Sequence, residues 1–99
     1  MYNKRFLDLA AVEIEAQVLL MPRSYTSFDY YTNFERNYRG LYEQFVRIYT
    51  DRQHDRAHAI KIVHSQLMHT INHCFQHFTR KVRTVHNPKG GDMSEWARV

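Results

Sequence analysis

The sequence predicts an all-α fold of three helices, in which two shorter helices pack along a long C-terminal helix at about residues 55–86. Along that segment apolar residues recur at steps of three and four, which is the spacing of one face of an α-helix. They are Ile60, Val63, Leu67, Ile71, Cys74, Phe78, Val82 and Val85. The chain also has only three Gly and two Pro, which leaves few turn residues for a fold rich in β-strands.

The first helix is predicted from about Asn3 to Leu20. Asn3 is a favoured N-cap residue, and Pro22 ends the helical pattern. The main apolar stripe is Leu7, Ala10, Ala11, Ile14, Val18 and Met21, and a second apolar group is Phe6, Leu9, Leu19 and Leu20. Together these side chains cover more than half of the helix circumference. We therefore expect burial between two neighbours, with docking into a groove on a partner as the alternative.

Four large aromatic residues crowd the loop that is predicted over residues 22–32, namely Tyr25, Phe28, Tyr30 and Tyr31. Loops seldom carry so many large rings, so these rings either pack back onto the helices or form a binding surface. Arginines stand on both sides of them, at Arg23, Arg36 and Arg39. Rings flanked by arginines suit a protein-binding hot spot, and they equally suit stacking on bases together with phosphate contacts.

The second helix is predicted to begin at Thr32, because Thr32 and Glu35 have the spacing of a capping box. Apolar residues then step by four, three, four and three, which suits packing against another helix at a shallow angle. They are Phe34, Tyr38, Leu41, Phe45 and Ile48. Residues 50–53 are polar, so we expect a tight turn there, with a continuous helix as the alternative.

The third helix, over residues 55–86, would complete a helical domain of residues 1–87. Arg80, Lys81 and Arg83 would lie in its last turns, where cations complement the helix dipole. The sequence Asn-Pro-Lys-Gly-Gly at residues 87–91 ends the pattern, and residues 88–99 are predicted to be a tail. The tail carries Trp96, which we expect either to fold back onto the domain or to anchor a partner.

The predicted helices are unequal in length, at about 45 Å for the third and about 25 Å for each of the other two. Part of the long apolar stripe, near Phe75 and Phe78, would then be bare unless the two shorter helices lie end to end. A bare apolar stripe is an interaction site. We therefore expect a protein partner or a homo-oligomer.

The formal net charge is +4 and is unevenly distributed. Residues 1–21 contain two Lys/Arg and three Asp/Glu, whereas residues 22–99 contain twelve Lys/Arg and seven Asp/Glu. A basic body favours an acidic partner, such as nucleic acid, an anionic membrane surface or an acidic protein.

Other sequence features narrow the class of protein. Cys74 is the only cysteine, so no disulfide forms within the chain, which fits a reducing compartment. No apolar stretch is long enough to span a bilayer, and acidic residues near the N-terminus argue against a signal peptide. We therefore expect a cytoplasmic protein. Catalytic motifs such as a glycine-rich phosphate loop or a nucleophile elbow are absent, so we expect no enzyme activity, no catalytic residue and no cofactor.

Five of the seven histidines fall on the polar face of the predicted third helix, namely His54, His58, His69, His73 and His77. Histidines spaced four residues apart on a helix can coordinate one metal ion together. Asp51 and Asp55 share the arc of His54 and His58, so these four residues are a candidate metal site. In the alternative, which we favour, the aspartates cap the helix and the histidines are solvated.

Three functions are compatible with these patterns, and the first is favoured. It is a non-catalytic interaction protein (a subunit, adaptor or inhibitor) with the contact residues Tyr25, Phe28, Tyr30, Tyr31, Phe75, Phe78 and Trp96. The second is a nucleic-acid-binding module that uses Arg23, Arg36, Arg39, Arg80, Lys81, Arg83 and Lys89. The third is a metal-binding helical protein that uses Asp51, His54, Asp55 and His58.

Overall fold

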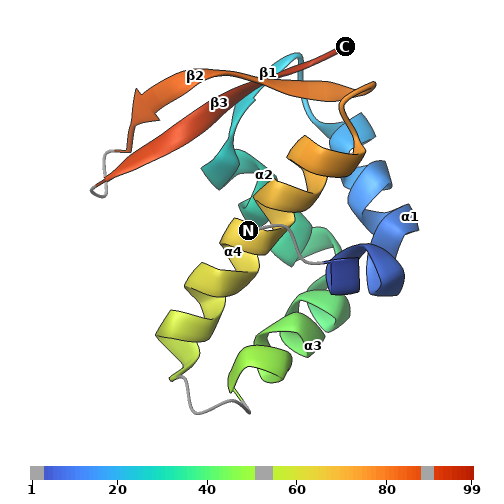
Figure 1. Ribbon diagram of the computed structural model, residues 1–99, viewed down its shortest axis with the longest axis vertical. Coiled ribbons are helices and arrows are strands. Elements are labelled where there is room, and N and C mark those ends of the chain that lie inside the picture. The colour runs from blue at the N-terminus through green and yellow to red at the C-terminus, as the bar shows by residue number, and fades with distance from the viewer. Residues whose placement is uncertain (1–3, 51–54, 88–90) are drawn as a thin grey trace.

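The computed structural model of the chain describes residues 4–50, 55–87 and 91–99. Within these residues the chain forms four helices and a three-stranded antiparallel sheet, so the predicted all-α bundle of three helices is wrong. In chain order the elements are α1 (Lys4–Leu20), β1 (Ser24–Thr26), α2 (Ser27–Asn37), α3 (Arg39–Thr50), α4 (Arg56–Cys74), β2 (Thr79–His86) and β3 (Asp92–Arg98). Figure 1 shows the sheet lying over one end of the group of helices.

The largest correction concerns the predicted long helix, which ends at Cys74 and not near His86. The backbone N–H of Phe75 closes the last turn on the carbonyl of Ile71, and the chain then turns into β2. β2 is rich in β-branched residues, which favour strands. Phe78, Val82 and Val85 thus match the helical spacing without being helical.

The residues predicted to form a tail provide the partner strand for β2. β3 pairs with β2 from Thr79 opposite Arg98 to His86 opposite Asp92, and it also pairs with β1, so the strand order is β1-β3-β2. Gly91, next to the start of β3, has a φ of 72°, a conformation that glycine adopts without strain. Such long-range pairing overrides local helical spacing, and for that reason periodicity alone did not reveal the hairpin.

The predicted second helix begins earlier than expected and is divided. The capping box consists of Thr26 and Asp29, in which the Asp29 N–H donates to Thr26 Oγ1 at 3.1 Å and the Thr26 N–H donates to Asp29 Oδ2 at 3.0 Å. Thr32 therefore lies inside α2, and the helix breaks at Tyr38 before α3 begins. α3 ends at Thr50 and α4 begins at Arg56 after the extended N-cap Asp55, so the alternative of one continuous helix is wrong, whereas the tight turn expected at residues 50–53 lies mostly outside the described residues.

Aromatic residues from the predicted loop form much of the core. Tyr25 and Tyr30 are almost fully buried, as is Phe34 from the predicted second helix, and the Tyr30 hydroxyl donates to the carbonyl of Ile14 in α1 at 2.9 Å. Trp96 of β3 is also buried, and its indole N–H donates to Ser27 Oγ at the start of α2 at 3.0 Å. The core thus joins the sheet to α2 and α2 to α1.

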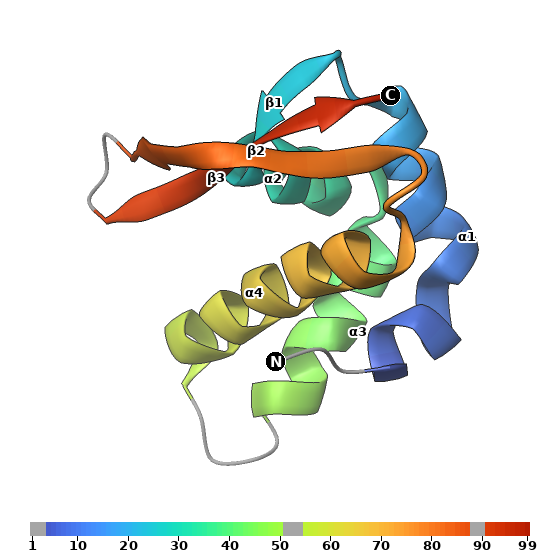
Figure 2. The ribbon, with the colours of Figure 1, turned by 45° about the horizontal axis from the view of Figure 1, so that its top comes forward.

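The hairpin of β2 and β3 runs beside α4. In Figures 1 and 2, the far ends of both strands, at His86 and Asp92, extend on the same side of the molecule as the N-terminal end of α4. α1 lies on the opposite side. One side of the molecule therefore presents α4 together with the hairpin.

Candidate nucleic-acid interface

The residues predicted for protein binding do not gather on one exposed surface. Four of the seven are buried core residues, namely Tyr25, Tyr30, Phe75 and Trp96. Phe28, Tyr31 and Phe78 are partly buried, and the Phe28 and Tyr31 rings meet edge to face with centroids 5.7 Å apart. The aromatic segment thus packs onto its own domain, which is the first of the two alternatives that its sequence left open.

The predicted metal group is only partly within the described residues, because Asp51 and His54 lie outside them. Asp55 is the N-cap of α4, and its Oδ1 accepts from the backbone N–H of His58 at 2.7 Å. Among the residues that the structure describes, no group of three or more His, Cys, Asp or Glu side chains could hold a metal ion. Asp55 therefore fits the capping alternative.

The predicted basic residues fall into three separate regions, and Lys89 lies outside the described residues. Arg23 precedes β1. Arg36 and Arg39 line an open hollow with Thr32 and Glu35, where Arg39 pairs with Glu35 at 2.7 Å, so the charge there is mixed. A third group, Arg80, Lys81 and Arg83, lies on β2.

The distribution of acidic residues along the sequence is a stronger signal than the clusters of basic residues. From Arg56 to Gly91 the chain contains no Asp or Glu, although it has ten elsewhere. The same 36 residues hold six Lys/Arg and six His. This segment covers α4 and β2, the two elements that share one side of the molecule. The fold therefore brings the two described elements of an acid-free segment to one side of the molecule.

The exposed face of α4 is polar. Its buried side carries Ala59, Val63, Leu67 and Ile71, which pack into the core. The opposite side exposes the hydrogen-bonding residues His58, Lys61, Ser65, His69, Asn72 and His73. The predicted histidine face therefore exists for His58, His69 and His73, whereas His77 follows the helix and His54 lies outside the described residues.

β2 is an edge strand, and five consecutive residues from Arg80 to Thr84 are exposed. A β-bulge lies between Lys81 and Arg83. Lys81 stands opposite Trp96, while Arg83 stands opposite Glu95 and pairs with it at 3.2 Å. Because neighbouring residues of a strand point to opposite faces, the bulge places Lys81 on the face of α4 and Arg83 on the other face.

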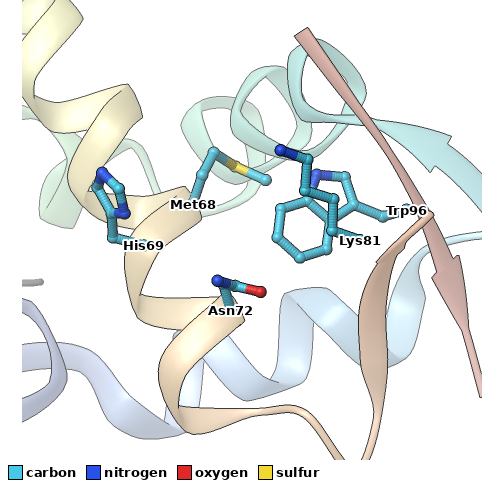
Figure 3. A pocket seen from close by; sticks show the side chains of 5 residues that line it. All are labelled: Met68, His69, Asn72, Lys81 and Trp96. Atoms are coloured by element: carbon cyan, nitrogen blue, oxygen red, sulfur yellow. The ribbon is translucent and has the colours of Figure 1, made fainter. Parts of the chain in front are cut away.

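A small pocket of about 120 Å³ lies between α4 and the hairpin. Figure 3 shows its lining, which consists of Met68, His69, Asn72, Lys81 and Trp96. Among the described residues, Lys81 makes no ion pair. We call this pocket the α4–β2 notch.

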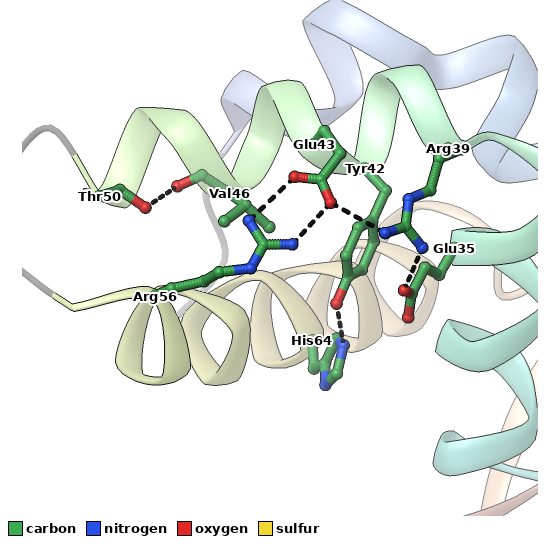
Figure 4. A network of polar contacts seen from close by, with 8 residues as sticks. All are labelled: Glu35, Arg39, Tyr42, Glu43, Val46, Thr50, Arg56 and His64. Carbon is green, nitrogen blue, oxygen red and sulfur yellow. Dashed lines mark hydrogen bonds and ion pairs between the residues drawn. The ribbon is translucent and has the colours of Figure 1, made fainter.

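Polar contacts fix α4 on α3, as Figure 4 shows. Arg56 at the start of α4 donates to both carboxylate oxygens of Glu43, at 2.7 and 3.0 Å, and this contact holds the pKa of Glu43 below its usual value. Farther along α4, His64 Nε2 lies 2.8 Å from the Tyr42 hydroxyl. The Tyr31 ring stacks on the His64 imidazole with centroids 3.7 Å apart. These contacts set the position of the exposed face of α4.

Comparison with protein-family models, with curated proteins and with solved structures finds no match to this chain. No helix in the described part of the chain is long and apolar enough to cross a membrane. The expectation of a cytoplasmic protein remains a prediction. The function must therefore be inferred from the surface of the molecule itself.

The partly buried imidazole of His64 makes stability depend on pH. Burial lowers the pKa of His64 to about 4, from about 6.5 in an unfolded chain. Between these values the unfolded state binds more protons, so the free energy of unfolding falls as the pH falls through that window. We expect wild-type protein to lose about 1–3 kcal/mol more than His64→Phe does between neutral pH and about pH 4.5.

Urea unfolding at the two pH values, followed by the fluorescence of the single Trp, measures this difference. His77→Gln, at an exposed position, is the control and should keep the wild-type pH dependence. Equal losses in wild-type protein and in His64→Phe would contradict the prediction.

Proposed function

We propose that this chain binds double-stranded nucleic acid through the surface formed by α4 and β2. The observation that supports this most is the acid-free segment of residues 56–91, because its two described elements share one exposed side. Phosphate contacts dominate the affinity of such binding, and an acidic side chain on this surface would oppose it. From the sequence alone this function ranks second, after protein binding through aromatic residues. We now favour it over protein binding because most of those aromatic residues are buried.

The order of the elements supports the same proposal. α3 and α4 are consecutive packed helices, and a β-hairpin follows whose second strand returns to β1. This is the order of a winged helix-turn-helix, in which the second helix of the pair enters the major groove. One fold can serve several functions, so the order of the elements does not by itself indicate nucleic-acid binding. The polar, acid-free surface of α4 is the feature that favours it.

The dimensions and side chains of α4 suit a major groove. Its 19 residues give a length of about 28 Å, and the major groove of B-DNA, about 12 Å wide, admits one helix. Lys61 and Ser65 lie on the exposed side of α4 and carry groups that can bond to base edges or phosphates. Lys81 on β2 would contact the backbone beside the groove.

The salt dependence of duplex binding tests this proposal. Among the described residues, two exposed cations on the α4 side of this surface make no ion pair, namely Lys61 and Lys81. Each phosphate contact contributes about −0.9 to the slope of log affinity against log salt, so we expect a slope of about −2 or steeper. Between about 50 and 200 mM KCl the affinity should then fall at least about 12-fold.

Fluorescence anisotropy with a labelled duplex measures the slope. Lys61→Ala should reduce it by about 1, uniformly across sequences. Arg36→Ala is the matched control, because Arg36 lies on α2 in the hollow of mixed charge and should leave the slope unchanged. No binding at about 50 mM KCl, or binding that is indifferent to salt, would contradict the proposal.

A second observation favours a protein contact, which was the first function expected from the sequence. Four large apolar side chains of α1 are exposed, at 42% for Leu9, 76% for Val12, 47% for Leu19 and 68% for Leu20. Val12, Leu19 and Leu20 have the spacing of one helix face. We propose that this face binds a second copy of the chain. α1 lies away from the hairpin ends, so a dimer would leave both α4–β2 surfaces free to bind successive turns of one duplex.

Light scattering coupled to size exclusion, across a hundredfold dilution, tests the dimer. We expect a concentration-dependent dimer that Val12→Glu shifts to monomer, because a carboxylate cannot be buried in an apolar contact at low cost. Val82→Glu, at another exposed apolar position, should not change the mass. A wild-type monomer at all concentrations would contradict this second proposal.

A further inference from the structure

We infer that the α4–β2 notch holds one phosphate group of the nucleic-acid backbone, with Lys81 and Asn72 as the donors that bind it. This inference rests on the proposed function, and it assigns a particular anion to a particular place. Its basis is the side-chain chemistry of the notch and the way in which the hairpin aims Lys81.

The notch has apolar walls and a polar rim. Trp96 is 2% exposed and is held by its bond to Ser27, while Met68 is partly buried against the core. Lys81, Asn72 and His69 are exposed at the rim, and they come from α4 and β2. In Figure 3 these side chains surround the same small space. The rigid wall of Trp96 therefore sets the distance between the two elements that carry the polar groups.

The rim offers donors and no carboxylate. The Lys81 ammonium has three N–H donors and the Asn72 amide has two. Partial burial lowers the pKa of His69, so its ring is neutral near pH 7 and adds one more donor. The nearest acidic residue along β3, Glu95, lies on the other face of the sheet and pairs with Arg83. An oxyanion is thus the ligand that this rim fits, since Lys81 is the charged side chain of the lining and no carboxylate belongs to it.

The β-bulge explains why Lys81 is available for that role. Without it, Lys81 and Arg83 would alternate onto the same face. With it, Arg83 turns to the far face and pairs with Glu95, while Lys81 remains beside α4 without an ion pair among the described residues. Bulges often re-aim a side chain next to a functional site.

A phosphodiester of a nucleic-acid backbone fits the α4–β2 notch better than a free anion does, because the notch is too small and too open to enclose a free anion. The notch is small, at about 120 Å³, and it opens beside the exposed face of α4. A backbone phosphate seated there would fix how deeply and at what angle α4 enters the groove. Such contacts position the protein on the duplex and carry no sequence information directly.

Neutral phosphates identify the contact. A set of duplexes of one sequence is prepared, each with a single methylphosphonate in place of one phosphate, and binding is measured for wild-type protein, Lys81→Gln and Lys61→Gln. For wild-type protein we expect about a tenfold loss at one or two backbone positions in the groove region. Lys81→Gln should bind unmodified duplex about tenfold more weakly and should be insensitive to the same substitutions, which is the signature of direct coupling.

Three results would bear against the inference in different ways. If Lys81→Gln loses as much as wild-type protein at every methylphosphonate position, the two changes are independent and the inference is overturned while the proposed function stands. The same holds if Lys61→Gln, and not Lys81→Gln, removes the sensitivity. If wild-type protein does not bind the unmodified duplex, the proposed function fails and the inference fails with it.

Asn72→Ala, which keeps the charge, should reduce the sensitivity partly and leave the salt slope unchanged.

Discussion

The pairing of β3 with both β1 and β2 is the interaction on which the rest of the structure depends. β3 is the last strand in the sequence and the central strand of the sheet. It carries Trp96 into the core against Ser27, and beside it the hydroxyl groups of Tyr25 and Thr79 hydrogen-bond to each other across 54 residues of sequence. Because β1 leads into α2 and β2 follows α4, this closure fixes both ends of the helical segment between them. The hairpin is thereby held beside α4.

That arrangement gives the acid-free segment its physical meaning. Six Lys/Arg side chains without a carboxylate among them would be a diffuse positive charge in an extended chain. In the fold, the helical part is anchored to α3 through Arg56 and Glu43 and through His64 and Tyr42. The strand part is placed next to it by the sheet. The result is a surface with a defined shape, polar groups along a helix and cations along an edge strand, which is the combination that a duplex requires.

The sequence predicted the helical elements better than the sheet. α1, the separation of α3 from α4 and the buried stripe from Val63 to Ile71 follow from local spacing. The end of α4 could not be found in that way, because Phe78, Val82 and Val85 continue the helical period, and only pairing with a distant strand makes them β2. The basic residues of β2 were recognised as candidates, but they were placed on a helix. The notch depends on a bulge and on the burial of Trp96, and neither leaves a local pattern. The absence of acidic residues from residues 56–91 is, by contrast, a property of the sequence alone, and it predicts the basic character of α4 and β2 without the fold.

Amide chemical-shift changes on titration with duplex DNA report which part of the surface is contacted. We expect the largest changes on the exposed side of α4, from His58 to His73, and on β2 from Arg80 to Thr84. The amides of α2 around Arg36 should change little. Changes concentrated on α1 or α2, or the absence of any change at low salt, would contradict the assignment of the α4–β2 surface as a nucleic-acid interface.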